Sequence, residues 1–241
     1  MAAKEEEPDG DLVRFISEVG IWSVDSYRRC SFRCVYCIAG SQGKSTPRHS
    51  ADRVVAALRG ELEAVPPQAE LFIGATADAY PPIERELGLT RLVLGEISRR
   101  GRPFCVATKG TLVLRDIDIL LGHAGHCDVY LSLATADEEV LRRLESGAPS
   151  AGERLDVIRA LHAAGVDVHV DASPWIPGIS RAEELLAALP PGVGVKFEPL
   201  DTRRLGDTPT VLGRRFSQAE ILDAYGDAGL KVGEERVVGG L

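Results

Sequence analysis

Short apolar runs alternate with longer amphipathic stretches along most of this chain, and this alternation restricts its fold more than any other feature. Strands are predicted at residues 21–24, 71–74, 104–109, 128–134, 166–172 and 193–199. Helices are predicted from helical spacing at 51–64, 89–100, 115–121, 151–163, 181–189 and 217–226. Successive strand–helix units are typical of an α/β fold with a parallel sheet and right-handed crossovers. Six units are too few for a closed eight-fold barrel, so we expect a partial (β/α)6 barrel with an open parallel sheet.

The N-terminus differs in composition from the rest of the chain. We expect residues 1–15 to form a disordered acidic tail and residues 16–241 to form one core domain with a short C-terminal extension. The tail lacks the basic and apolar regions of a secretory signal, and no apolar run reaches membrane-spanning length. A cytoplasmic location without membrane attachment is therefore predicted.

The charge balance bears on the kind of partner. With 28 basic and 36 acidic residues the net charge is −8, so the overall field repels nucleic acid. A protein that grips a duplex normally presents a basic surface that displaces counterions. Nucleic acid is thus an unfavourable partner, and a small-molecule substrate is expected.

Three of the five cysteines, Cys30, Cys34 and Cys37, form a C-x3-C-x2-C loop soon after the first predicted strand. Thiolates suit iron–sulfur irons, and short spacers allow one loop to wrap a four-iron cluster. Three ligands for four irons leave one iron open to a small molecule. The alternative is a structural zinc site, for which His49 is the nearest fourth ligand.

Further motifs lie at the ends of the later predicted strands. They read ADAYPPIE at 77–84, ATK at 107–109, LVLRDID at 112–118, LSL at 131–133, LESGAPS at 144–150 and SPWIPG at 173–178. Together with the cysteine loop, this set resembles the radical S-adenosylmethionine (radical SAM) superfamily, in its branch related to spore photoproduct lyase. The resemblance runs from about Trp22 to Gly178.

This resemblance implies both cofactors and their contacts. The three cysteines would hold a [4Fe–4S] cluster that reductively cleaves S-adenosylmethionine to a 5′-deoxyadenosyl radical, with flavodoxin or ferredoxin as electron donor. The implied S-adenosylmethionine contacts are Tyr36 and Ile176 near the adenine, Asp78 at the methionyl ammonium, Lys109 at the methionyl carboxylate and Ser132 at the ribose. Plainer roles stay open, such as helix capping for Asp78 and loop packing for Tyr36.

The chain departs from the branch in ways that concern its substrate. Ala75 stands where spore photoproduct lyase carries a cysteine hydrogen donor. Cys105 and Cys127 fall near the amino ends of their predicted strands, the wrong end for the site, so they are expected to be small buried hydrophobic residues.

Trp175 and Glu198 are the candidate catalytic residues. Trp175 would line the substrate pocket as a stacking platform, or serve only in packing. Glu198 would bind a substrate hydroxyl or amine or move a proton, or pair only with Lys196 or Arg203.

The resulting hypothesis is a radical SAM enzyme that abstracts hydrogen from a small polar substrate, a sugar, nucleoside or amino acid, in a biosynthetic tailoring step. Three alternatives remain: a photoproduct-repair lyase-like enzyme, a non-enzymatic zinc-binding domain, and a member that binds S-adenosylmethionine without cleaving it.

Overall fold

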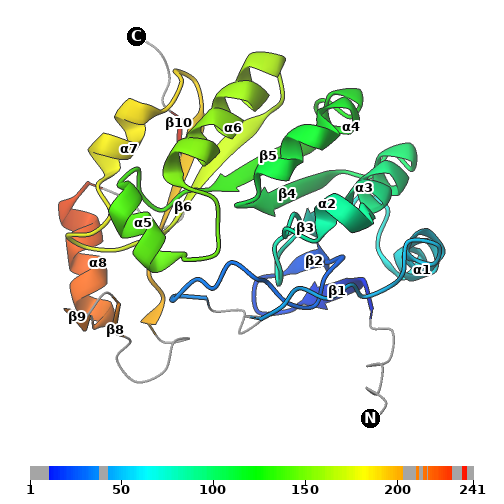
Figure 1. The fold of residues 1–241 in the computed structure, drawn as a ribbon, viewed down its shortest axis with the longest axis horizontal. Helices are drawn as coiled ribbons and strands as arrows, with labels where there is room; N and C mark the ends of the chain where they lie inside the picture. The colour runs from blue at the N-terminus through cyan, green and yellow to red at the C-terminus, as the bar shows by residue number, and fades with distance from the viewer. Residues whose placement is uncertain are drawn as a thin grey trace.

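The structure is a computed structural model that describes residues 11–37, 43–202, 210–211, 214–215, 217–229 and 235–237. Its main sheet has the strand order β1-β2-β3-β4-β5-β6-β7-β10 (Figure 1). Strands β2 to β7 are parallel, whereas β1 and β10 pair antiparallel at the two edges. The predicted α/β fold with an open, partial barrel is confirmed.

The strands of the main sheet are β1 (Val13–Ile16), β2 (Ile21–Val24), β3 (Leu71–Ile73), β4 (Phe104–Thr108), β5 (Cys127–Ser132), β6 (Val168–Trp175), β7 (Gly194–Pro199) and β10 (Glu235–Val237). A separate two-stranded ribbon contains β8 (Thr210–Val211) and β9 (Arg214–Arg215). All six predicted strands are present, and the largest difference is that the fifth continues to Trp175.

The helices are α1 (Val54–Glu61), α2 (Glu84–Leu87), α3 (Leu89–Arg99), α4 (Ile117–Gly122), α5 (Glu138–Leu144), α6 (Ala151–Ala164), α7 (Ala182–Ala188) and α8 (Gln218–Asp227). Two 3-10 turns, Leu62–Ala64 and Thr111–Asp116, extend α1 and precede α4. Capping boxes at Ser150 and Ser217 fix the starts of α6 and α8. The short helices α2 and α5 are additions to the predicted set.

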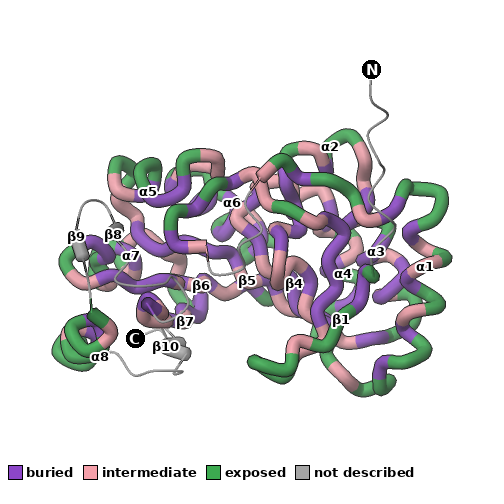
Figure 2. The backbone as a smooth tube through the Cα atoms, turned by 90° about the horizontal axis from the view of Figure 1, so that it is seen from below, coloured by how far each residue is buried: buried purple, intermediate pink, exposed green. Residues whose placement is uncertain are grey.

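The two faces of the sheet differ in polarity. Alternate strand residues such as Ile73, Val106, Val129 and Val170 are buried beneath α3, α4 and α6, which line one face (Figure 1). Figure 2 shows the same division, with buried backbone along the strands and exposed backbone on the outer helices. The opposite, concave face carries polar side chains, and the site lies on this face at the carboxyl ends of the strands.

The predicted N-terminal tail is too long. Residues 1–10 lie outside the described part of the chain, but Val13–Ile16 forms β1 and pairs with β2 in register Val13 to Val24. The strand was missed because Arg14 and Phe15 are exposed at the sheet edge, so no continuous apolar run marks it. None of the helices in the described ranges is both long and apolar enough to cross a bilayer.

Candidate active site

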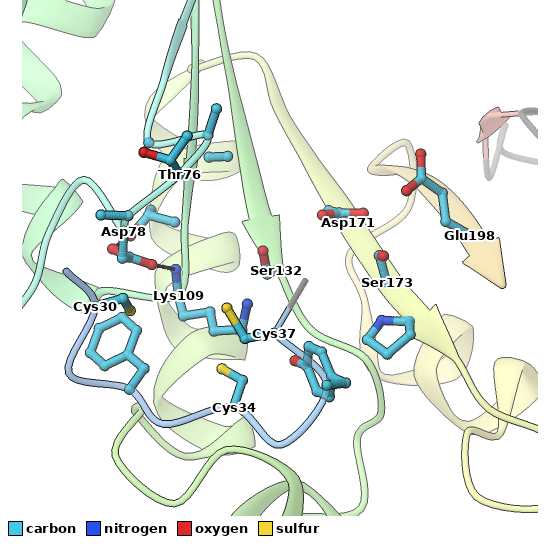
Figure 3. A pocket seen from close by; sticks show the side chains of 18 of the residues that line it. Cys30, Cys34, Cys37, Thr76, Asp78, Lys109, Ser132, Asp171, Ser173 and Glu198 are labelled. Atoms are coloured by element: carbon cyan, nitrogen blue, oxygen red, sulfur yellow. Dashed lines mark hydrogen bonds between the residues drawn. The ribbon is translucent and has the colours of Figure 1, made fainter. Parts of the chain in front are cut away.

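A cavity of about 310 Å³ lies at the carboxyl ends of the parallel strands (Figure 3). The cysteine loop and the ends of β3 to β7 contribute its walls. Eight predicted site residues line it: Cys30, Cys34, Cys37, Tyr36, Asp78, Lys109, Ser132 and Glu198. Residues far apart in the sequence meet here because the carboxyl ends of parallel strands share one edge of the sheet.

The cysteine loop is held by backbone pairing to the segment that precedes α6. Cys34 forms an isolated antiparallel bridge with Glu145, and Val35 N donates to Leu144 O at 2.9 Å. Gly147 N donates to Phe32 O at 3.0 Å. The LESGAPS motif therefore supports the loop that carries the cysteines.

The closest approach between the LESGAPS motif and the cysteine loop is at Gly147. A Cβ at Gly147 would lie 2.5 Å from Ser31 O, and backbone cannot move aside cheaply. We expect Gly147→Ala to cost about 1–3 kcal/mol of unfolding free energy through overpacking, and to lower the iron content after reconstitution. Urea unfolding and iron analysis measure the two effects.

Gly152, five residues later in α6, is the matched control because a Cβ there meets nothing within 4 Å. Gly152→Ala should keep full iron content and change stability by no more than about 1 kcal/mol, in the stabilising direction. Equal behaviour of the two variants would contradict the packing argument.

A buried polar network joins the loop to the end of β5. Tyr36 Oη donates to Glu145, and Glu145 also forms an ion pair with Arg154. The Arg154 guanidinium donates in addition to Ser132 O and Pro149 O, both at 2.9 Å. Arg154 and Glu145 are almost completely buried, so each depends on the other for its hydrogen bonds. Tyr36 thus lines the cavity while its hydroxyl positions the loop.

The zinc alternative requires its ligand atoms to lie close together. Two sulfur ligands of one zinc lie at most about 4.6 Å apart, twice the Zn–S bond length. Among the described residues, no metal-ligand trio within 4.8 Å includes Cys30, Cys34 and Cys37 or His49. The described part of the chain therefore presents no ready-made zinc site at the cysteine loop.

Two of the three thiols, those of Cys30 and Cys34, ionise less readily than a free cysteine when no metal is bound. Burial raises the pKa of the Cys34 thiol to about 12, with Lys109 acting in the opposite direction. Burial raises the pKa of Cys30 as well, and Asp78 adds to the effect. Bound iron would supply the positive charge that holds these sulfurs as thiolates, so the donor set fits an iron–sulfur cluster.

Asp78 and Lys109 come from the loops that follow the neighbouring strands β3 and β4. Asp78 accepts hydrogen bonds from Thr108 Oγ1 at 2.6 Å, Lys109 N at 2.8 Å and Tyr80 N at 2.8 Å. It is not a helix N-cap, since Ile83 precedes α2. Lys109 Nζ lies 5.8 Å from the centroid of the Tyr36 ring, between the cysteine loop and the strand ends. This leaves an ammonium group next to the cysteines.

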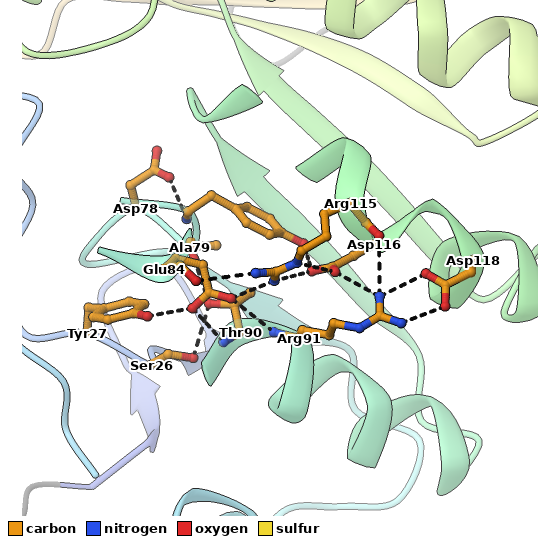
Figure 4. Close-up of polar contacts among 11 residues, drawn as sticks. Ser26, Tyr27, Asp78, Ala79, Glu84, Thr90, Arg91, Arg115, Asp116 and Asp118 are labelled. Atoms are coloured by element: carbon orange, nitrogen blue, oxygen red, sulfur yellow. Dashed lines mark hydrogen bonds and ion pairs between the residues drawn. The ribbon is translucent and has the colours of Figure 1, made fainter. Parts of the chain in front are cut away.

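A second buried network fixes the loop that carries Asp78 (Figure 4). Glu84 accepts from Arg115 Nη2 at 2.6 Å, and Asp116 accepts from Tyr80 Oη at 3.0 Å. Both carboxylates are buried, and arginine and tyrosine donors satisfy them. These motif residues do not line the cavity, so their role is to hold the loop in place.

Trp175 and Ile176 do not line the cavity, and Trp175 takes the packing role that the sequence left open. The pairing of β6 with β7 shifts register between Ala172 and Trp175, which breaks the alternation of the strand. Trp175 consequently turns into the core and packs edge-on against Tyr225 of α8, with ring centroids 5.7 Å apart. Ile176 is completely buried in a cluster that includes Phe32, Cys34 and Tyr36 of the cysteine loop, so it packs behind the wall of the cavity, and its contact with the adenine stays a prediction.

The structure adds Asp171 of β6 to the site, a residue that sequence reasoning did not select. It lines the cavity with Glu198, which forms an ion pair with Lys196 at 2.6 Å. The sequence did contain an indication of this residue. His169 and Asp171 interrupt the apolar run that a fully buried parallel strand would show. Cys105 and Cys127 are buried in β4 and β5, as predicted.

A family model described as the radical SAM superfamily matches residues 24–189. The chain belongs to the radical SAM superfamily. It is accordingly an enzyme that uses a [4Fe–4S] cluster and S-adenosylmethionine.

Two relatives each match 70% of this chain. The uncharacterized protein Rv2578c of Mycobacterium tuberculosis is 33% identical over 181 residues, which are 70% of this chain and 53% of the relative. The uncharacterized protein MJ0683 of Methanocaldococcus jannaschii is 25% identical, over 70% of this chain and 65% of the relative. The chain thus spans about half the length of its mycobacterial relative.

Two solved structures share the fold at low identity. A spore photoproduct lyase variant with bound AdoMet and dinucleoside spore photoproduct has a TM-score of 0.56 at 18% identity, covering 89% of this chain and 62% of the lyase. SuiB of Streptococcus suis bound to S-adenosylmethionine has a TM-score of 0.59 at 12% identity, covering 86% of this chain and 46% of SuiB. At these identities the likeness concerns the fold alone.

Proposed function

We propose that this radical SAM enzyme abstracts a hydrogen atom from a small polar substrate, a sugar, nucleoside or amino acid, in a biosynthetic tailoring step. The observation that carries the proposal is one cavity lined by the three cysteines on one side and by Asp171 and Glu198 on another. When bound, the cluster supplies the electron that cleaves S-adenosylmethionine to methionine and the 5′-deoxyadenosyl radical.

The side chains near the cysteines would orient the cofactor. Lys109 would bind the methionyl carboxylate as a point charge, and Ser132, at the end of β5, would donate to the ribose. Asp78 has three donors from its own chain, which supports a role in shaping the wall while one lone pair meets the methionyl ammonium. The sheet behind the cavity would exclude water from this chemistry.

Repair of a nucleic acid photoproduct is the second candidate, favoured only by the fold shared with spore photoproduct lyase. Ala75 lines the cavity, and among the described residues that line it the cysteines are only the three of the loop. The net charge of −8 also disfavours a duplex substrate. A small molecule is therefore the better proposal.

Anaerobic reconstitution followed by incubation with dithionite and S-adenosylmethionine tests the function. The expected result is a brown protein that releases methionine and 5′-deoxyadenosine, faster when the correct small molecule is present. Faster release with a photoproduct oligonucleotide than with any small molecule would favour repair. A cluster without 5′-deoxyadenosine would indicate binding without turnover and would refute the proposal.

The electron donor is proposed to be a small acidic protein such as flavodoxin or ferredoxin. Exposed basic residues Arg29, Arg33 and Lys44 lie in or next to the cysteine loop of an otherwise acidic chain. We expect ferredoxin-supported cleavage to slow by about tenfold from low to high ionic strength, because salt screens charge-steered association. Dithionite-supported cleavage is the control, and equal salt dependence of the two would contradict the proposal.

A further inference from the structure

The concave face of β6 and β7 carries an alternating row of polar side chains. In β6, Asp171 and Ser173 point to this face while the intervening Ala172 is completely buried on the other. In β7, Lys196 and Glu198 occupy the corresponding positions. Asp171 stands directly opposite Lys196 in the pairing register. This row reaches the cavity at its carboxyl end.

Asp171 has an acceptor atom that its own chain leaves unsatisfied. Its Oδ1 is buried and has no hydrogen-bond partner among the described residues, although the side chain lines the cavity. Figure 3 shows Asp171, Ser173 and Glu198 together on the side of the cavity away from the cysteines. A buried carboxylate oxygen without a donor is unfavourable, so the position favours a ligand that brings one.

The charged groups around Asp171 indicate the charge of the ligand that would bind there. Glu198 and Lys196 face it from β7, Lys109 from the end of β4, and Glu145 from the segment before α6. Lys196 is already engaged in the ion pair with Glu198, so this side of the cavity has one carboxylate in excess. Burial raises the pKa of Asp171 to about 6, and Glu198 acts in the same direction. At pH 7 the group is mainly ionised and lacks a full counter-charge.

We propose that Asp171 and Glu198 bind a cationic group of the substrate, an ammonium or guanidinium, and so select an amine-bearing small molecule. An ammonium offers three donors to the free oxygens and neutralises the excess charge, which a neutral hydroxyl cannot do. The inference rests on the proposed function. In that function the methionyl ammonium of S-adenosylmethionine is bound near Asp78, on the side of the cavity that carries the cysteines. Asp171 Oδ1 is then left to recognise the second molecule, with Glu198 Oε2 beside its ion pair to Lys196 as the other acceptor.

Paired probes that differ only in charge test the assignment. Calorimetry would compare glucosamine with glucose, and pentane-1,5-diamine with pentane-1,5-diol, on reconstituted enzyme with S-adenosylmethionine bound. We expect at least one amine to bind about tenfold more tightly than its neutral partner, and Asp171→Asn or Glu198→Gln to remove most of that preference. The affinity for S-adenosylmethionine should stay within about twofold in both variants.

The pH dependence supplies a second measurement. Since the pKa of Asp171 is raised to about 6, the carboxylate is lost as the pH falls through this value, and the amine preference should fall with it. Asp171→Asn should show no such transition. Glu183→Gln, which removes an exposed carboxylate from α7, is the control for general surface charge and should keep the full preference.

No amine binding better than its neutral partner, or equal losses in Glu183→Gln and Asp171→Asn, would overturn the inference. Weaker S-adenosylmethionine binding in Asp171→Asn would assign the carboxylate to the cofactor and would overturn it as well. These failures differ from failure of the proposed function, which would appear as absence of cluster or of 5′-deoxyadenosine in the unmodified enzyme.

Discussion

Replacing Cys30, Cys34 and Cys37 together by alanine is expected to abolish both the iron–sulfur cluster and the cleavage of S-adenosylmethionine. All three thiols line one cavity and come from one loop, and no other cysteine lines that cavity among the described residues. The remaining side chains offer no soft ligand set for iron. Iron and sulfide analysis, visible absorbance and 5′-deoxyadenosine release measure the loss, which should reach the level seen without enzyme.

The double variant Cys105→Ala and Cys127→Ala is the control. Both residues are buried in the sheet, away from the cavity, and Cys127 Sγ contacts Leu120 O at 3.3 Å. Their truncation should cost about 1 kcal/mol each and leave iron content and cleavage unchanged. Cleavage that survives in the triple variant, or is lost in the double variant, would show that the cluster is held elsewhere.

The fold was largely predictable because its signals are local. The apolar runs that became β3 and β4 end at Gly74 and Lys109, and the observed strands end within one residue of these positions. The edge strand β1 was not predictable in this way, since half of its side chains face solvent. Its position depends on antiparallel pairing to β2, which only the assembled sheet reveals.

The site was predictable where residues lie at strand ends and less so where backbone geometry intervenes. Lys109 and Ser132 follow from the end positions of β4 and β5. Trp175 packs in the core because a register shift changes the end of β6, and the sequence alone could not choose between its stacking and packing roles. The polar interruption of the apolar run in β6 could have drawn attention to Asp171, but the lack of a hydrogen-bond partner for its Oδ1 is a property of packing that only the structure reveals.

Replacing Arg154 by methionine is expected to destabilise the fold strongly and to loosen the cysteine loop. The side chain is completely buried and holds Glu145, Ser132 O and Pro149 O at once. Removing one partner of a buried ion pair leaves the other charge uncompensated, at a cost of about 3–5 kcal/mol. Urea unfolding measures the loss, and iron content should fall because Glu145 pairs with Cys34 through the backbone.

Arg159, one and a half turns further along α6, provides the comparison. It is about half exposed, forms an ion pair with exposed Asp156 and donates to Ala188 O at 3.2 Å on the surface, so Arg159→Met should cost no more than about 1 kcal/mol. If Arg154→Met does not yield folded protein, Tyr36→Phe removes a single hydrogen bond to the same carboxylate and should cost about 1.5–3 kcal/mol. An effect of Arg154→Met as small as that of Arg159→Met would mean that the loop is held by its backbone contacts alone. The Gly147 contact would then be the main restraint on the position of the three cysteines.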